Sequence, residues 1–199
     1  MKVWRVAVMA KKMLGADYLL LLLYLNNQEP IKGAVRLTKM MFLFNKQISE
    51  TLKRKGLESE QLPDFIAYNY GPFSKDVYEQ IELFTGIGFV AVTDINTKEE
   101  MSGIDDVVEA EFIDECYQGD SELKTENNFW EYRITEVGKG FVEKELLADL
   151  TVEQKGILEA FKRKITEMPI KQLLYYVYTN YPDYTEKSLI KDEVLDNGN

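Results

Sequence analysis

Carboxylates are the side chains most able to do chemistry in this chain, and many of them fall in one segment. Paired acids such as Asp105 with Asp106, and Asp114 with Glu115, could serve as general acid and base. They stand within a longer run of acidic residues, which is typical of a solvated loop. Histidine, the usual acid–base catalyst and metal ligand near neutral pH, is absent. We therefore predict a protein that is not an enzyme, with no catalytic residue, cofactor or metal site.

Two other kinds of site are disfavoured by the cysteine and glycine content. The single cysteine, Cys116, cannot form a disulfide within the chain or supply the thiolates of a structural zinc site. Gly86 and Gly88 lack the further glycine of a dinucleotide fingerprint and the Gly-Lys-Ser/Thr ending of a phosphate loop. This glycine pair is typical of the end of a helix before a strand.

The most apolar run of the sequence indicates a buried helix. Residues 18–25 form a run of eight apolar residues, whereas a helix that crosses a bilayer needs roughly 20. The short apolar stretch near the amino end is closed by Lys11 and Lys12, so no secretory signal is expected. Together with the single cysteine, these features predict a cytoplasmic protein with no membrane partner.

The negative charge of the chain is concentrated between residues 94 and 131. The net charge is −10, and this segment alone carries 13 acidic and two basic residues. An acidic surface segment attracts a basic partner and repels acidic competitors. Asp105, Asp106, Glu109 and Glu111 are therefore candidate contacts for a protein partner, and a basic partner would fit their charge.

A basic stretch lies earlier in the chain and leaves an alternative open. Residues 32–55 contain seven cations against the single acid Glu50. Such a run is usually the solvated face of a helix, and it can also bind nucleic acid. Apolar spacing in this stretch predicts that Arg36, Lys39 and Lys46 lie outside the core, so Arg36 and Lys39 are candidate nucleic-acid contacts.

Periodicity and turn residues predict an α+β fold that is mainly helical. Apolar residues recur at helical spacing in several segments, and aromatic and β-branched residues mark short strands. The predicted helices cover 17–25, 33–48, 74–85, 141–150, 151–165 and the stretch after 169, and the predicted strands cover 89–92 and 130–135. Three helices, a strand, a wing and a strand are the linear order of a winged helix-turn-helix core with a small antiparallel sheet. We predict this core over residues 1–150, with an acidic insertion at 94–131 and a helical extension at 151–199 packed on the core.

Polar residues and prolines predict where the helices begin. We expect Asp17 and Ser74 to be N-caps, and Thr151 with Gln154 to form a capping box. Replacing Ser74 by alanine should then cost about 1 kcal/mol. Pro169 suits the first position of a helix, and the tail after residue 192 lacks a core-forming pattern. One core should combine the two strands with a set of six apolar residues, Leu37, Met41, Phe44, Val77, Ile81 and Phe84.

Four motifs resemble those of a known group of proteins. They are Gly-(x)3-Leu-(x)2-Met-x-Phe-Leu-Phe at 33–44, Tyr-Gly-Pro-Phe-Ser-(x)2-Val-Tyr at 70–78, Tyr-x-Ile-Thr-x-x-Gly at 132–138 and Tyr-x-Tyr-x-x-Tyr-Pro at 176–182. The chain resembles the YwgA-like family and, more distantly, the Panacea or SocA-type antitoxin domain. This resemblance implies a small cytoplasmic winged-helix-like module, and its antitoxin side implies a protein partner that is neutralised or delivered. The acidic insertion departs from the pattern.

Two functions follow as hypotheses. The first is a non-catalytic regulatory or adaptor module that binds a protein partner, with Tyr70, Phe73 and Tyr78 as aromatic contacts of the kind enriched at interfaces. The alternative is a DNA-binding transcriptional regulator, in which the helix at 74–85 would enter the major groove. The positions of this helix predicted to be exposed are Lys75, Asp76, Glu79, Gln80 and Glu82. Their carboxylates would repel the phosphate backbone, so DNA binding through Lys75 and Gln80 is disfavoured.

Overall fold

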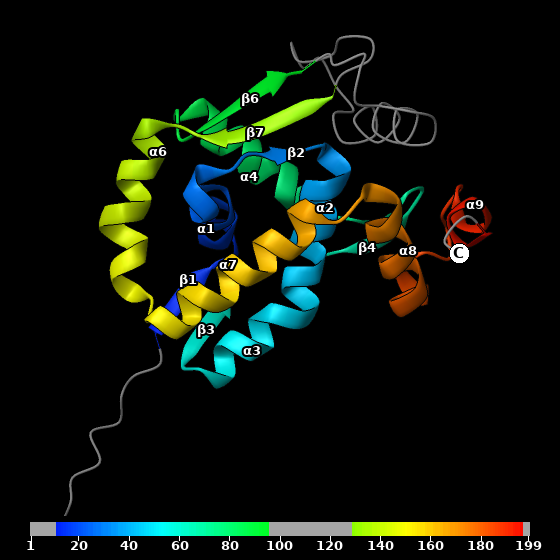
Figure 1. Cartoon of the computed structure of the whole chain (residues 1–199), viewed down its shortest axis with the longest axis horizontal. Coiled ribbons are helices and arrows are strands. Elements are labelled where there is room, and N and C mark those ends of the chain that lie inside the picture. Colours follow the sequence, from blue (N-terminus) through cyan, green and yellow to red (C-terminus); the bar gives the residue numbers. More distant parts are fainter. Residues whose placement is uncertain (1–10, 96–128, 197–199) are drawn as a thin grey trace, which may run out of the picture.

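The computed structural model describes residues 11–95 and 129–196, and these form an α+β arrangement that is mainly helical (Figure 1). The first part contains β1 (Lys11–Leu14), α1 (Gly15–Gln28), β2 (Ile31–Lys32), α2 (Ala34–Leu43), a π-helical turn (Phe44–Ile48), α3 (Ser49–Arg54), β3 (Leu57–Glu60), β4 (Ile66–Tyr68), β5 (Gly71–Phe73), α4 (Lys75–Gly86) and β6 (Val90–Asp94). The second part contains β7 (Trp130–Ile134), α6 (Glu136–Phe141), a π-helical turn (Val142–Leu146), a 3-10 turn (Leu147–Asp149), α7 (Val152–Glu167), α8 (Ile170–Asn180), a 3-10 turn (Pro182–Tyr184) and α9 (Lys191–Asp196). The predicted fold class is confirmed at this level.

The strands form three small sheets. The largest has the order β2-β7-β6 and is antiparallel throughout. Lys32 lies opposite Glu131 in its register, and Thr93 lies opposite Glu131 on the other side. Strands β4 and β5 form an antiparallel pair, whereas β1 and β3 form a parallel pair. Both strands predicted around residues 89–92 and 130–135 are therefore present, and they pair with each other.

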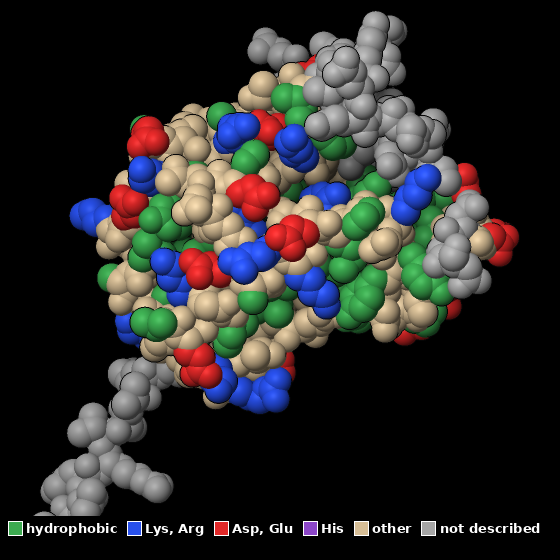
Figure 2. All heavy atoms as spheres, in the orientation of Figure 1, with side chains coloured by type: hydrophobic (Ala, Val, Ile, Leu, Met, Phe, Trp, Pro, Cys, Tyr) green, Lys and Arg blue, Asp and Glu red, His purple; other side chains and the backbone are tan. Residues whose placement is uncertain are grey.

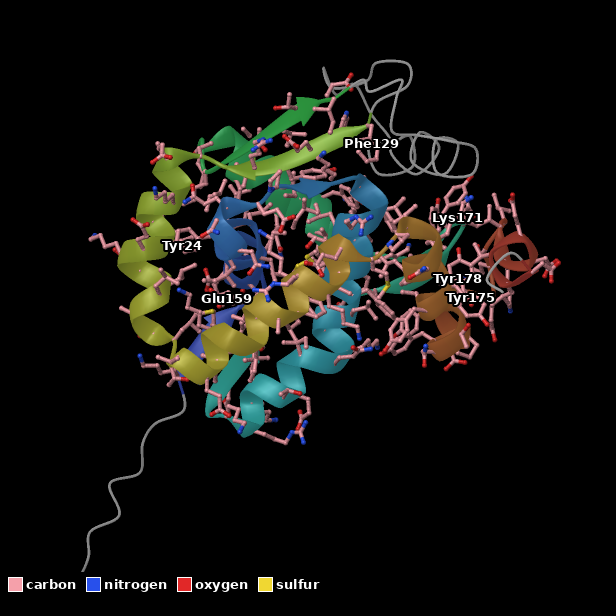
Figure 3. All side chains as sticks on the ribbon, in the orientation of Figure 1. Tyr24, Phe129, Glu159, Lys171, Tyr175 and Tyr178 are labelled. Atoms are coloured by element: carbon pink, nitrogen blue, oxygen red, sulfur yellow. The ribbon has the colours of Figure 1, made fainter. Side chains whose placement is uncertain are left out.

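Helix α1 lies at the centre of the molecule, with α7 packed across it and the largest sheet next to it (Figure 1). Its leucines are buried on every side, as expected for a helix without a polar face. The regular helix ends after Tyr24, because Leu25 has an extended ψ of 168° and Asn26 and Asn27 adopt left-handed backbone angles. The side chain of Tyr24 extends to the turn after α6, where its hydroxyl donates to a carboxylate oxygen of Glu143 at 3.0 Å (Figure 3).

The predicted core is confirmed. All six of the apolar residues expected to pack together belong to one buried cluster, which also contains Val90, Tyr132 and Ile134 of the sheet. Residues of α7 and α8 belong to the same cluster, among them Leu158 and Leu173. The helical stripes of α2 and α4 thus share one core with the sheet, and the face of α4 opposite its stripe is exposed.

The prediction that Lys39 lies outside the core is wrong. Its side chain is completely buried, and its ammonium donates to the backbone carbonyl oxygens of Tyr70 at 2.6 Å and Pro72 at 3.0 Å. A buried cation needs such partners because removal from water disfavours its charge. Lys46 is exposed as predicted.

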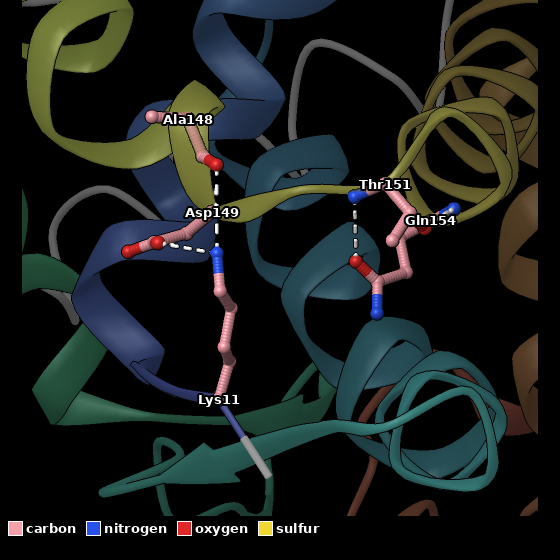
Figure 4. Close-up of polar contacts among 5 residues, drawn as sticks. All are labelled: Lys11, Ala148, Asp149, Thr151 and Gln154. Carbon is pink, nitrogen blue, oxygen red and sulfur yellow. Dashed lines mark hydrogen bonds and ion pairs between the residues drawn. The ribbon is translucent and has the colours of Figure 1, made fainter. Parts of the chain in front are cut away.

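The predicted capping residues have different outcomes. Helix α1 begins at Gly15, so Asp17 is not the N-cap, and its carboxylate instead accepts from the backbone N–H of Leu14 at 2.9 Å. Ser74 does occupy the N-cap of α4, but its hydroxyl makes no capping hydrogen bond. The capping box at the start of α7 is confirmed: Thr151 and Gln154 exchange hydrogen bonds of 3.2 and 2.8 Å, the second of which is drawn in Figure 4.

The chain after β7 is more helical than predicted. Residues 136–140, which precede the helix predicted at 141–150, belong to α6, because the hydroxyl of Thr135 caps it by accepting from the backbone N–H of Gly138 at 3.1 Å. Pro169 is the N-cap of α8 rather than its first helical residue. The tail after residue 192 was predicted to lack a core-forming pattern, yet residues up to Asp196 belong to α9, whose Val194 is buried.

Candidate partner-binding face and charged pocket

Two of the three aromatic residues predicted to contact a partner are part of the core. Tyr70 is 3% exposed and Tyr78 is 2% exposed, so neither can form a docking surface. The hydroxyl of Tyr78 shares a hydrogen bond with that of Thr38, which explains why this polar group tolerates burial. Phe73 is half-buried and stacks on Tyr78 with ring centroids 5.8 Å apart.

The Tyr-Gly-Pro motif leads from the turn between β4 and β5 into β5, and it is held from two sides. Gly71 has a φ of +85°, and a Cβ added there would lie 3.0 Å from the ring of Tyr178 on α8. Only glycine adopts this backbone geometry without strain. On the inner side, the buried ammonium of Lys39 holds the carbonyls of the residues before and after this glycine. The motif therefore has a structural role that accounts for its residues without a ligand.

The four candidate nucleic-acid contacts do not form one face. Arg36 is half-buried, and its guanidinium donates to the carbonyl oxygens of Ile165 at 2.5 Å and Met168 at 2.6 Å, at the end of α7. Lys39 is buried, as described above. Lys75 is exposed and pairs with Glu79 at 2.9 Å, while Gln80 is half-buried. The predicted basic face of Arg36 and Lys39 is therefore wrong.

The four acidic candidates, Asp105, Asp106, Glu109 and Glu111, lie outside the described residues. An acidic surface is nevertheless present on α4. Its exposed side chains include Glu79, Glu82, Leu83 and Ile87, which we call the α4 face. Leu83 is 58% exposed and Ile87, which directly follows the helix, is 50% exposed. This combination of apolar side chains with carboxylates differs from a solvated helix face, where apolar residues are scattered singly.

Helix α6 lies next to the end of α4 and adds an exposed apolar residue near the α4 face. Thr135 ties the two together, because its hydroxyl donates to the carbonyl oxygen of Gly88 at 2.6 Å. The backbones approach so closely that a Cβ at Gly138 would lie 2.3 Å from the carbonyl oxygen of Phe89. Val137, in the first turn of α6, is 62% exposed. Sequence reasoning missed the apolar part of this region, although Leu83 and Ile87 both fall outside the buried stripe of α4.

A pocket of about 480 Å³ lies where β2 and β7 meet the start of α2 and the end of α7. Six of its seven lining residues are polar or charged: Glu29, Lys32, Arg36, Glu131, Arg133 and Thr166, with Pro30 as the seventh. We call this the charged pocket. Figure 2 shows acidic and basic side chains gathered between the sheet and α7. Glu131 is only 4% exposed and forms an ion pair with Arg133.

A second buried lysine stands behind the charged pocket. Lys162 of α7 donates to the carbonyl oxygens of Leu25 at 2.7 Å and Glu29 at 2.6 Å. Burial lowers the pKa of Lys162 from 10.5 to about 8, and the nearby carboxylate of Glu29 acts in the opposite direction. Between those two carbonyls, residues 26–28 have φ values of 54°, 58° and 59°. The lysine thus holds a strained segment that leads directly into the wall of the pocket.

Neither a metal site nor a membrane-spanning helix is found in the described parts of the chain. Within residues 11–95 and 129–196, no three acidic, histidine or cysteine side chains are grouped so that they could hold a metal ion. None of the helices in these two ranges has the length and apolar character needed to cross a membrane. Comparison with protein-family models, curated proteins and solved structures finds no match to this chain.

Proposed function

We propose that this protein is a non-catalytic adaptor with a winged-helix-type core, and that its α4 face binds a protein partner. The observation that carries the proposal is the composition of this face, in which Leu83 and Ile87 are exposed beside Glu79 and Glu82. Apolar side chains supply binding free energy at an interface, and carboxylates select a partner with basic residues. Glu82 forms no ion pair within the described residues, whereas Glu79 already pairs with Lys75, so Glu82 is the main acidic contact.

The order of the elements supports a winged-helix-type core. Helix α1 is followed by β2 and α2, and α4 is followed by β6 and β7. The first strand pairs with the last in the sheet order β2-β7-β6. In DNA-binding members of this architecture, the helix before the second strand enters the major groove. By analogy alone, α4 is the helix that would carry recognition.

A DNA-binding regulator is the second candidate, and only this order of elements favours it. The charge of α4 opposes it, since binding to DNA depends on cations that neutralise phosphates. Lys75, the cation of α4, already pairs with Glu79. Asp76 is also committed, because its carboxylate accepts from the backbone N–H of Asp64 at 2.8 Å. We therefore rank protein binding above DNA binding.

The resemblance to the YwgA-like family and the Panacea or SocA-type domain agrees with a protein partner. An antitoxin-like module neutralises or delivers another protein, and this requires a surface rather than a catalytic centre. We extend the proposal accordingly: the partner is a basic protein whose activity or stability changes when the α4 face covers it.

The test compares binding by the wild type and by two matched variants. The first variant combines Leu83→Asp with Ile87→Asp on the α4 face. The control is Val152→Asp on α7, where the wild-type side chain is 91% exposed and lies on another element. Proteins captured from the native host by the wild type are identified, and the candidate is then titrated in purified form. We expect the double variant to weaken its binding at least tenfold and the control to leave it unchanged.

Two outcomes would contradict the proposal. Equal affinity of the double variant and the wild type would exclude the α4 face as the binding surface. Submicromolar binding of duplex DNA at physiological salt, weakened by Lys75→Gln, would instead favour the regulator. A binding affinity that falls with rising salt is expected for the basic partner, because Glu79 and Glu82 of the α4 face are exposed.

A further inference from the structure

The charged pocket contains an arginine that is held in place by a buried carboxylate. Glu131 and Arg133 are two residues apart on β7, so their side chains lie on the same face of the sheet. The ion pair joins the Nε of Arg133 to a carboxylate oxygen of Glu131. The Glu131 side chain is only 6% exposed, whereas that of Arg133 is 53% exposed.

This ion pair leaves most of the guanidinium for another partner. Guanidinium carries five N–H donors in a rigid fork, and the pair with Glu131 involves only Nε. The terminal nitrogens of Arg133 make no hydrogen bond within the described residues. The orientation of the fork is fixed in advance, so less side-chain entropy is lost when a ligand binds.

Two further cations line the same pocket. Arg36 is fixed by its hydrogen bonds to the end of α7, and Lys32 is exposed on β2, directly opposite Glu131. Three cations therefore face two carboxylates, Glu29 and Glu131, so the lining has a net charge of +1. One carboxylate is already neutralised by Arg133.

We propose that the charged pocket binds an oxyanion, a carboxylate or a phosphate group, through Arg133. A guanidinium fork matches the geometry of both groups because it donates two parallel hydrogen bonds. Lys32 and Arg36 add to the positive potential, and Glu131 acts as a positioning residue. The exposed Glu29 opposes the ligand. Its repulsion grows with the charge of the ligand, which favours a carboxylate over a phosphate dianion.

The test is a nuclear magnetic resonance titration of the labelled full chain at low ionic strength, because salt would screen the pocket. The probes are acetate and inorganic phosphate, added separately. We expect saturable shifts of the backbone amides at residues 29–36 and 131–133. The probe that binds more tightly, acetate or phosphate, shows whether the pocket prefers a carboxylate or a phosphate group. Arg133→Gln should weaken binding at least tenfold. Arg163→Gln on α7, an exposed arginine outside the pocket, should have no effect.

A second variant should change the affinity in the opposite direction. Glu29→Gln removes the opposing carboxylate, so binding should strengthen severalfold. Shifts that rise linearly with both probes up to about 10 mM, with no saturation, would overturn the proposal, as would equal titration curves for the wild type and Arg133→Gln. The double variant of the α4 face should titrate like the wild type, so failure of this site and failure of the proposed partner binding can be told apart.

Discussion

Lys39 and Lys162 are both completely buried, in different parts of the molecule, and each donates to two backbone carbonyls. Lys39 holds residues 70–72, which lead from the β4–β5 turn into β5 and where Gly71 already permits a positive φ. Lys162 holds residues 25–29, where three residues other than glycine have positive φ values.

The difference teaches what a buried cation can do for a backbone. Left-handed angles cost roughly 1–2 kcal/mol for an ordinary residue and less for asparagine, so Asn26 and Asn27 reduce the strain that Lys162 must offset. At the other site, glycine removes the strain, and Lys39 chiefly satisfies carbonyls in the core. The same interaction therefore stabilises an irregular segment in one region and satisfies buried polar groups in the other.

Removal of Lys39 should have the largest effect. Lys39→Met keeps the apolar part of the side chain but leaves the carbonyls of Tyr70 and Pro72 without this donor. Each buried unsatisfied group costs roughly 1–3 kcal/mol, so we expect the free energy of unfolding to fall by about 3 kcal/mol. Denaturant titration measures it, with Lys53→Met at an exposed position as the control. A loss no larger than that of the control would mean that the turn carbonyls find other partners.

The region of Lys162 should differ through its pH dependence. Because the pKa of Lys162 is lowered from 10.5 to about 8 in the folded chain, the unfolded chain binds more protons between these two pH values. Stability should therefore rise with pH in this window, by about 2 kcal/mol between pH 8 and 10.

The measurement is the difference in unfolding free energy between the wild type and Lys162→Met across this pH range. The difference isolates Lys162 from the other groups that titrate there. If the unfolding free energies of the wild type and Lys162→Met depend on pH in the same way, Lys162 does not change its protonation on unfolding in this range. The contrast drawn between the two lysines would then be wrong.

The helix that carries Lys162 begins with a complete cap, and its loss should cost about 1 kcal/mol. Thr151→Ala removes the hydroxyl that accepts from the backbone N–H of Gln154. Thermal unfolding of this variant should show a lower melting temperature. Thr151→Ser retains the hydroxyl and should restore most of the difference, whereas equal melting of all three proteins would show that the cap contributes nothing.

The helix after the turn held by Lys39 should respond least to loss of its N-cap side chain. Ser74 is buried, and its hydroxyl has no hydrogen-bond partner within the described residues. Ser74→Ala should therefore change the free energy of unfolding by less than about 0.5 kcal/mol. This replaces the cost of about 1 kcal/mol expected from the sequence. A loss as large as that of Thr151→Ala, in the same thermal unfolding series, would restore the original expectation.

Local patterns predicted much of the fold. The stripes of α2 and α4, the strands β6 and β7 and the capping box of α7 all depend on residues close together in the chain. The burial of Lys39 could not be predicted in this way, because the carbonyls that it binds belong to residues 31 and 33 positions later. Charge alone suggested exposure, and only the tertiary structure supplies the partners that make burial possible.

The two candidate sites differ in the same respect. The α4 face could have been found from the sequence, since Leu83 and Ile87 fall off the stripe formed by Val77, Ile81 and Phe84. The charged pocket could not, because its walls come from β2, α2, β7 and α7. Arg36 was singled out as a nucleic-acid contact, but its partners at the end of α7 are 129 and 132 residues away.

The contact between Gly71 and Tyr178 connects the turn to the last described part of the chain. Tyr178 lies on α8 (Figure 3), and its hydroxyl shares a hydrogen bond of 2.7 Å with that of Ser188. The backbone N–H of Leu189 donates to the carbonyl oxygen of Asn69, in the turn between β4 and β5, at 2.8 Å. Limited proteolysis between residues 185 and 190 would therefore loosen a turn more than 100 positions earlier in the chain. For protein engineering, a truncation that removes residues 185–190 would therefore alter the packed core.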